Sequence, residues 1–276
     1  MKMYKISNLI IFLGLVIPFF NLLSQIEEQP SPLGPGKGRK QSEIGLSIGV
    51  GPNWQSGEFF ATCDCPSFKD GSGFVFSPNL FYQRDITDVF QWGAMLGLTF
   101  QNTTSSYKER ELLTFESQTG EKFTNVPVLF REQMDLKFNQ LNFMPYITFS
   151  PFEFAFLRLG VQTGLPLVAS SKHTKELLEN RIRLDNGETI ALTIGNGNQV
   201  VLEDGKIDNV SSLTFSLVPA LGFNFSISGN VFLGITYSFY IPLNNYSERG
   251  KDFKLNYWLI SLDLKYALVL RKWINY

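Results

Sequence analysis

His173 is the only histidine of the chain and therefore the side chain best suited to acid–base chemistry near neutral pH. It follows Ser170, Ser171 and Lys172 at the start of a long stretch that we expect to be a loop. Catalysis also needs an acid or a nucleophile nearby, and none stands at a recognisable spacing from it in the sequence. A solvated loop histidine is the simpler interpretation, so we predict no catalytic, cofactor-binding or metal-binding residue.

Cys63 and Cys65 form a Cys-Asp-Cys sequence in another expected loop. In an exported protein the two thiols would oxidise. A disulfide across one intervening residue closes a cramped, strained ring. A metal site would want more ligands, and His173 is far along the chain. We therefore expect either a local disulfide between these cysteines or a bond to another chain.

Arg158, Asp263 and Lys265 all fall in the polar phase of alternating strands. If these strands close into a narrow barrel, the three charges lie inside it and must pair. We predict structural ion pairs among them. The alternative is a charged constriction in a small pore, but eight strands leave room only for side chains.

The last strand shows most clearly how such residues are positioned. Every second residue from Trp258 to Leu270 is apolar, and the residues between them are mixed and mostly small or polar. A period of two indicates a strand with one apolar face. The strand is also longer than the five or six residues usual in soluble sheets.

Seven further segments follow the same rule, with large apolar residues on one face and Gly, Ser, Thr, Asn or Gln on the other. A soluble barrel would hold its bulky residues inside. Bulk outside and small polar residues within is the pattern of an outer-membrane barrel. We predict eight antiparallel transmembrane strands, near residues 44–53, 74–83, 90–100, 140–149, 157–165, 213–227, 231–241 and 258–270.

Four prolines interrupt these strands. Pro52, Pro78, Pro145 and Pro219 fall in strand phase, and a closed sheet has no free edge to accept a residue without an N–H donor. We expect each of them to lie near a rim or at a bulge.

The connections between the strands alternate in length. Three are short, and four are long, at residues 54–73, 101–138, 167–212 and 244–255. This predicts short periplasmic turns and long extracellular loops. Within the loop 167–212, Asn186-Gly187 and Asp204-Gly205 are hairpin-turn sequences, which predict two hairpins whose edges could accept a partner strand.

The N-terminus resembles a secretory signal peptide. Lys2 and Lys5 precede an apolar segment at 9–20, and Ser24 offers a cleavage point. We predict a signal peptide at 1–24, a flexible linker at 25–42 and a barrel domain at 43–276. With 24 basic and 25 acidic residues the chain has a net charge of −1, so we expect no nucleic-acid partner.

The strands resemble those of the PorT-like, general outer-membrane β-barrel family and, more loosely, the eight-stranded barrels of OmpX and OmpA. The resemblance covers residues 43–276. It rests on the opening strand EIGLSIGVGPNW, on LNFMPYITFSPFEFAFLRLGVQTGLPL and on the aromatic C-terminal residue. It implies localisation in the cell outer membrane.

We therefore expect a protein of the outer membrane that is not an enzyme and carries no cofactor. Its expected partners are membrane lipid and an extracellular ligand or protein, bound through the loops 101–138 and 167–212. Its expected role is surface-structural or binding. The alternatives are an outer-membrane lipid hydrolase that uses His173 and an accessory membrane subunit of a protein-secretion system.

Overall fold

The computed structural model describes residues 42–62, 66–116, 122–152, 154–183, 187, 189–195, 197–228 and 230–268. The predicted signal peptide, the predicted linker up to residue 41, and both cysteines lie outside these residues. Among the residues described, no helix is long and apolar enough to cross a membrane. The strands are β1 (Ser42–Phe59), β2 (Ser72–Asp85), β3 (Phe90–Glu116), β4 (Lys122–Phe152), β5 (Ala155–Leu177), β6 (Arg181–Arg183), β7 (Thr189–Ala191), β8 (Ile194–Gly195), β9 (Asn198–Lys206), β10 (Thr214–Ser228), β11 (Val231–Pro242) and β12 (Gly250–Leu268).

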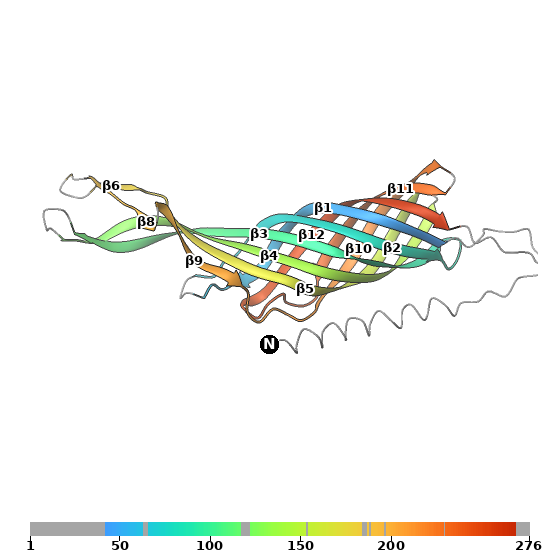
Figure 1. Ribbon diagram of the computed structural model, residues 1–276, viewed down its shortest axis with the longest axis horizontal. Helices are drawn as coiled ribbons and strands as arrows, with labels where there is room; N and C mark the ends of the chain where they lie inside the picture. Colours follow the sequence, from blue (N-terminus) through green and yellow to red (C-terminus); the bar gives the residue numbers. More distant parts are fainter. Residues whose placement is uncertain are drawn as a thin grey trace, which may run out of the picture.

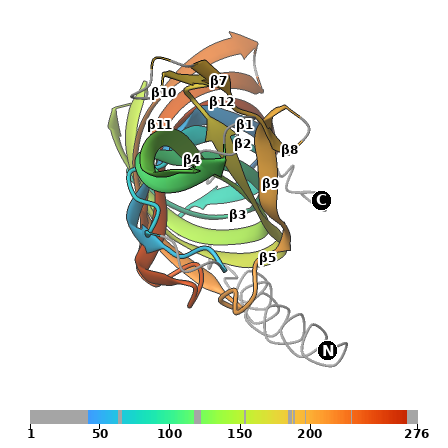
Figure 2. The ribbon, with the colours of Figure 1, turned by 90° about the vertical axis from the view of Figure 1, so that its left-hand side faces the viewer.

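Eight of these strands form a closed antiparallel ring (Figures 1 and 2). The order around the ring is β1, β2, β3, β4, β5, β10, β11 and β12. Pairing of β5 with β10 bypasses the four short strands between them, and pairing of β12 with β1 completes the ring. The predicted eight-stranded barrel is confirmed.

The wall of the ring has its apolar side chains outside. On β1, Leu46 and Ile48 are 53% and 54% exposed, whereas Ser47 between them is 3% exposed. The same alternation runs through the other ring strands. A face of this kind is stable only against hydrocarbon, because water would oppose the exposure of so many large apolar side chains.

Glycines in the wall make room for aromatic rings inside the barrel. Gly45 pairs with Phe81, and a Cβ on Gly45 would lie 2.3 Å from that ring. Gly222 pairs with Phe156, and a Cβ on Gly222 would lie 2.1 Å from that ring. The interior thus holds large rings as well as small polar groups, and the glycines are packing partners of these rings.

The four prolines lie inside their strands and face outward, so the prediction of rims or bulges is wrong. The register continues without a shift on both sides of Pro52, Pro78, Pro145 and Pro219. Each proline is paired with one neighbouring strand and skipped on the other. Loss of one N–H donor interrupts the ladder on one side only, and the barrel accepts this without a change of register.

The longest strands continue far beyond the ring. β3 has 27 residues and β4 has 31, although about 10 residues suffice to cross the hydrocarbon. The pairing of β2 with β3 ends at Thr104, and from there to Glu116 β3 pairs with β4 alone. This extension is about 40 Å long and is visible at the left of Figure 1. The prediction of a loop at 101–138 is therefore wrong.

The polarity of β4 reverses where it leaves the barrel. Its even-numbered residues face inward throughout, but they are polar or mixed from Gln140 to Thr148 and mostly apolar from Val128 to Phe138. The register with β5 shifts at the same level, between Asn139 and Gln140. The shift leaves Leu167 unpaired in β5. This level marks the upper limit of the lipid-facing wall.

Candidate functional site

A second β-structure stands above the barrel, on the side opposite the short turns. We call it the upper sheet: residues 105–116 of β3, 122–138 of β4, 169–177 of β5, and β9, with β8 at its edge. The hairpin of β6 and β7 lies beside it. Its lower part rests on an apolar cluster that fills the barrel mouth. The cluster contains Phe59, Phe68, Met134, Leu136, Phe138, Ile207, Tyr246, Phe253 and Leu255.

His173 lies in this upper sheet and not in a loop. It is a residue of β5, opposite Met134 of β4, and it is 1% exposed. Its Nε2 lies 2.8 Å from Oε2 of Glu132, and its ring meets the ring of Phe68 edge-on with centroids 5.1 Å apart. The prediction of a solvated loop histidine is wrong because β5 continues past the membrane level.

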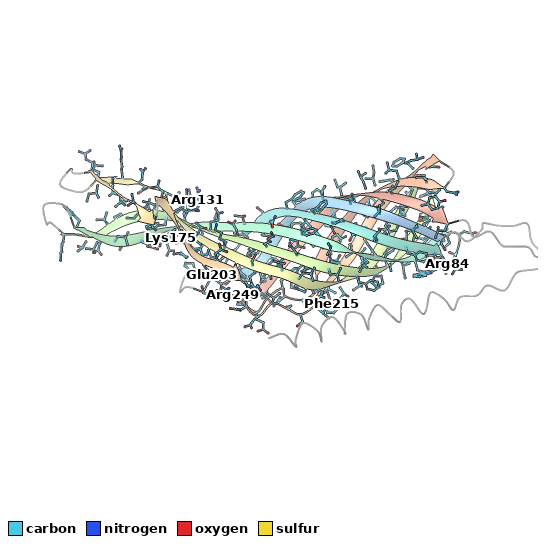
Figure 3. All side chains as sticks on the ribbon, in the orientation of Figure 1. Arg84, Arg131, Lys175, Glu203, Phe215 and Arg249 are labelled. Atoms are coloured by element: carbon cyan, nitrogen blue, oxygen red, sulfur yellow. The ribbon has the colours of Figure 1, made fainter. Side chains whose placement is uncertain are left out.

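Lys175 extends this buried contact into a network of charges. Its Nζ bonds to Glu111 and lies 3.4 Å from Oε1 of Glu132 and 4.4 Å from the ring centroid of Phe130. Burial disfavours the charged amine, but the carboxylates of Glu111 and Glu132 outweigh it and raise the pKa of Lys175 above its ordinary value. The lysine therefore stays charged and links β3, β4 and β5. Figure 3 labels Lys175 in the upper sheet.

Three carboxylates of this network come close enough to share a metal ion. Oxygens of Glu109, Glu111 and Glu132 lie within 4.8 Å of one another. Hard divalent cations prefer such oxygen ligands. However, the ammonium of Lys175 contacts two of the three carboxylates. The positive charge that the cluster requires is thus supplied by the protein itself.

Glu203 of β9 joins the upper sheet to two loops at the barrel mouth. Its carboxylate accepts hydrogen bonds from Nη1 and Nη2 of Arg249 at 2.8 and 3.2 Å, and from the backbone N and Oγ1 of Thr62 at 3.1 and 2.8 Å. Oγ of Ser171 donates a further bond at 3.2 Å. The bonds from Arg249, followed by those from Thr62, lower the pKa of Glu203 to about 2 against the opposing effect of partial burial. Figure 3 labels Glu203 and Arg249 where they meet.

β9 forms one edge of the upper sheet. It pairs with β5 on one side, and β8 covers only Asn198 and Gln199 on the other. From Val200 to Lys206, the described residues supply no backbone partner on the side away from β5. Val201 and Leu202 on this strand are 48% and 47% exposed.

The other edge of the upper sheet is very different. Beyond Thr104, β3 has β4 on one side only, and its sequence there is dominated by alternating charges. Lys108, Glu109, Arg110 and Glu111 are consecutive. Charged side chains are a common means of preventing unwanted pairing at a strand edge. We call the β3 edge charge-protected because it carries four consecutive charges, although Leu112 on it is also exposed. The β9 edge carries two adjacent exposed apolar residues, Val201 and Leu202, beside isolated charges.

The three interior charges predicted from the sequence do lie inside the barrel. Arg158, Asp263 and Lys265 are each 4% exposed or less. The guanidinium of Arg158 and the amine of Lys265 lie 5.1 and 4.7 Å from the ring centroid of Phe156, and Asp263 accepts a 2.7 Å hydrogen bond from Thr236. Among these described residues, no nitrogen–oxygen contact of 4.0 Å or less joins the three charges. The two cations lie near aromatic rings and Asp263 bonds to Thr236, so the direct ion pairs that we expected are not formed among these three residues.

The remaining sequence-predicted features have mixed outcomes. Arg181–Arg183 and Thr189–Ala191 pair as a hairpin around Gly187, as predicted, while Asn186 itself lies outside the described residues. The second predicted hairpin turn is wrong, because Asp204 and Gly205 are inside β9. Cys63 and Cys65 are also outside the described residues, so their disulfide stays a prediction.

Sequence analysis missed Glu132, Lys175 and Glu203. One pattern could have revealed the first, since Glu132 interrupts an alternating apolar series from Val128 to Phe138. A charge in the apolar phase of a strand needs a buried partner. The pairing of Glu203 with Arg249 joins residues far apart in the sequence and had no local pattern to indicate it.

The ring, its outward apolar wall and its long strands on one side define an eight-stranded β-barrel of the outer-membrane type. No family model matches the sequence, and no curated protein has significant sequence similarity to it. The resemblance to the PorT-like family therefore stays a prediction.

Several solved outer-membrane barrels are similar in structure. The attachment invasion locus protein Ail of Yersinia pestis is 14% identical, with 82% of this chain and 99% of Ail covered at a TM-score of 0.33. AlkL is 8% identical, with 91% and 100% covered at a TM-score of 0.37. The outer-membrane protease OmpT of Escherichia coli is 8% identical, with 83% and 97% covered at a TM-score of 0.36.

The expectation that the chain is not an enzyme has to be corrected. The similar barrels include OmpT, which is a protease, so a barrel fold does not exclude catalysis. At this level of identity the likeness concerns the fold alone and assigns no activity to the chain.

Proposed function

We propose that the chain is an outer-membrane surface protein that binds an extracellular protein through its upper sheet. The outward apolar wall supports a membrane location, and the long strands opposite the short turns support an extracellular position for the sheet. The proposed contact is the free edge of β9, where an extended segment of the partner would add as a further strand.

The observation that carries the proposal is the anchored but unpaired state of β9. The strand pairs with β5 through seven residue pairs, from Ser170–Lys206 to Glu176–Gln199. Glu203 fixes it further to Arg249 and Thr62. A strand held so firmly on one side presents its other edge in a fixed conformation. An incoming segment would therefore lose little free energy to ordering of β9.

The side chains of β9 fit an extended segment of mixed character. Val201 and Leu202 offer apolar contact, while Asp204 and Lys206 nearby are exposed and carry opposite charges. Leu202 is unpaired at a bulge in the register with β5. The bulge lets two consecutive apolar residues face outward, and backbone hydrogen bonds to the flanking residues would supply the rest of the affinity.

A photo-crosslinking residue at Leu202 tests this proposal in intact cells. We expect covalent adducts with one extracellular protein from Leu202. We expect no such adduct from the same residue at Leu112, a 65% exposed position on the charge-protected strand β3. Val201→Lys should abolish the adduct, because a lysine at an edge opposes strand pairing. The proposal would be overturned by equal adducts at both positions or by an adduct that survives Val201→Lys.

Strand addition also makes a backbone prediction. Once the partner is identified, the crosslinked segment is made as a peptide and added to the purified barrel. Amides of residues 200–206 should then become protected from hydrogen exchange, while those of residues 105–116 stay unchanged. Unchanged exchange in β9 at saturating peptide would contradict strand addition.

A further inference from the structure

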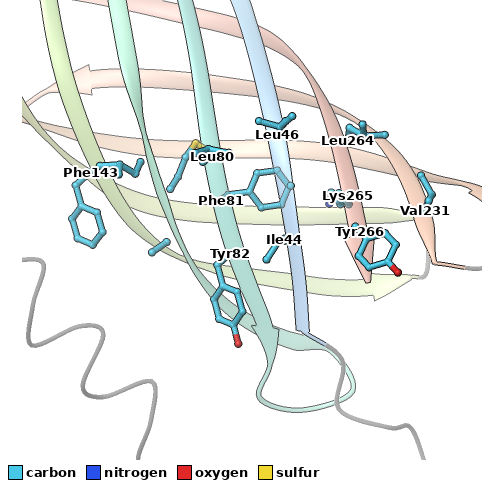
Figure 4. A pocket seen from close by; sticks show the side chains of 14 residues that line it. Ile44, Leu46, Leu80, Phe81, Tyr82, Phe143, Val231, Leu264, Lys265 and Tyr266 are labelled. Atoms are coloured by element: carbon cyan, nitrogen blue, oxygen red, sulfur yellow. The ribbon is translucent and has the colours of Figure 1, made fainter. Parts of the chain in front are cut away.

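The outer wall near the short turns contains an apolar groove of about 770 Å³ (Figure 4). It lies between two rows of outward side chains that follow the hydrogen-bonded pairs from strand to strand. The row nearer the turns contains Val231, Tyr266, Ile44, Tyr82 and Ala94. The row nearer the barrel centre contains Leu264, Leu46, Leu80, Leu96 and Phe143.

The floor of the groove is the wall itself. It is formed at the row of inward residues between the two outer rows, where Lys265, Gly45, Phe81 and Met95 are paired. Gly45 has no side chain, and the ring of Phe81 lies directly beneath it. Only the backbone of the wall therefore separates the groove from the side chains inside the barrel.

Two residues widen the groove at its inner end. Ala94 is the smallest member of its row and lies opposite Tyr82. Phe143 is in the outward phase of β4 but is only 6% exposed, because it packs against Ala94 and Leu165 instead of projecting outward. The groove is therefore deepest relative to its two flanking rows where Ala94 and Phe143 project least.

The dimensions of the groove match one leaflet of a membrane. It crosses from β11 to β4, which is five strand spacings of about 4.8 Å, or about 24 Å. The strands of such barrels tilt by about 40° from the membrane normal. A groove of about 24 Å that runs perpendicular to the strands therefore rises by about 15 Å along the normal. Half of a hydrocarbon core about 30 Å thick is the same distance.

We propose that this groove is a binding site for one acyl chain of a phospholipid from the leaflet on the turn side. The groove is continuous with the lipid-facing wall, so hydrocarbon reaches it from the membrane without any opening of the barrel. The chain end would lie beside Ala94 and Phe143. The headgroup would lie near Tyr266 and Val231, which is the first residue of β11 after the turn.

Tyr266 supports this orientation. Tyr266 is the third residue from the end of β12, and its ring is 48% exposed on the outer wall. Tyrosine rings prefer the boundary between hydrocarbon and headgroups. The polar end of the groove therefore coincides with the polar end of a lipid.

An acyl chain would prefer the groove to the surrounding bilayer because of closer packing contacts. The hydrophobic effect does not contribute, since bilayer hydrocarbon is equally apolar. A chain in the groove gains dispersion contacts on both sides and beneath, where a chain on a flat wall touches one side only. This predicts a modest selectivity that depends on the open space at Ala94.

The experiment compares Ala94→Phe, which fills the inner end, with Val161→Phe, which adds the same ring to the outer wall of β5 away from the groove. Wild-type protein and variants are refolded into phosphatidylethanolamine vesicles with chains of 16 to 18 carbons, transferred to detergent and examined by native mass spectrometry. We expect about one retained lipid per wild-type barrel and about a tenfold lower retained fraction for Ala94→Phe. Val161→Phe should match the wild type.

Two further arms make the result decisive. Ala94→Gly keeps the groove open and should retain lipid as the wild type does, and phosphatidylethanolamine with short chains should be retained less by every variant. Heat-modifiable gel mobility confirms that each barrel is folded. The proposal would be overturned if the wild type retained no lipid, if Ala94→Phe retained as much as Val161→Phe, or if short and long chains were retained equally.

Discussion

The barrel wall and the upper sheet are made from the same strands, but they bury opposite kinds of side chain. In the wall, β4 exposes Ile147 and buries Asn142. In the upper sheet, the same strand buries Phe130 and Phe138 and directs Arg131 outward. The same face of β4 points inward in both regions. The two regions therefore differ only in whether the inward or the outward residues are apolar. A continuous strand can therefore pass from lipid to water by exchanging the polarity of its two faces.

The largest effect is expected where the upper sheet meets the barrel. Phe138→Ala removes a fully buried ring from the cluster at the barrel mouth. A cavity of this kind costs about 3–5 kcal/mol of unfolding free energy. Urea denaturation of the folded barrel in vesicles measures it. A loss below about 1 kcal/mol would show that the cluster is not a packed core.

The next effect concerns the wall. Ile48→Arg places a charge on the outward face of β1, and it should lower the unfolding free energy by about 2–4 kcal/mol. Gln133→Arg, in the outward phase of the upper sheet, should change it by less than about 0.5 kcal/mol. If the two substitutions cost the same, the difference in surrounding solvent between the two regions would be disproved.

A smaller effect is expected within the charged network. Glu132→Gln weakens the contacts to His173 and Lys175, and loss of a buried charged partner should cost about 1–3 kcal/mol. The control is Glu176→Gln, because Glu176 forms a half-exposed pair with Arg131 at 3.1 Å. That change should cost about 0–1 kcal/mol. Equal costs would mean that burial of the network contributes nothing.

The smallest effect is a dependence on pH at β9. The folded-state pKa of Glu203 is lowered from 4.5 to about 2, so its contribution is complete above pH 4.5 and is lost as the pH falls toward 2. Protease cleavage of β9 should increase across this window in the wild type. Glu203→Gln should be cleaved more readily at neutral pH and show a flatter pH profile. Identical profiles for the two proteins would contradict the role of Glu203.

Much of the barrel could be predicted from the sequence, because the period of two is strong where one face is uniformly bulky. The strand phases, the eight-stranded ring and the interior positions of Arg158, Asp263 and Lys265 all follow from that pattern. The prolines were misjudged because a missing donor was assumed to require a bulge. The ladder instead loses contact on one side and keeps its register.

The upper sheet was missed although its period is equally regular. Met134, Leu136 and Phe138 alternate with polar residues, but their parity is opposite to that of the apolar residues at 141–149 in the same strand. The sequence analysis began this strand at residue 140 and interpreted residues 101–138 as a loop. Long-range pairs such as Glu203 with Arg249 could not be predicted, because only the closed ring brings β9 beside the loop before β12.

The reversal at Asn139 and Gln140 also fixes how deeply the barrel sits. Sinking by about five residues along β4 would carry the charges of Lys137 and Asp135 into hydrocarbon, where a charged side chain costs up to about 2.5–3.5 kcal/mol. Rising by the same amount would expose outward apolar residues at 141–149 to water. The reversal therefore restrains vertical displacement in both directions, and it holds β9 at a constant height above the membrane surface.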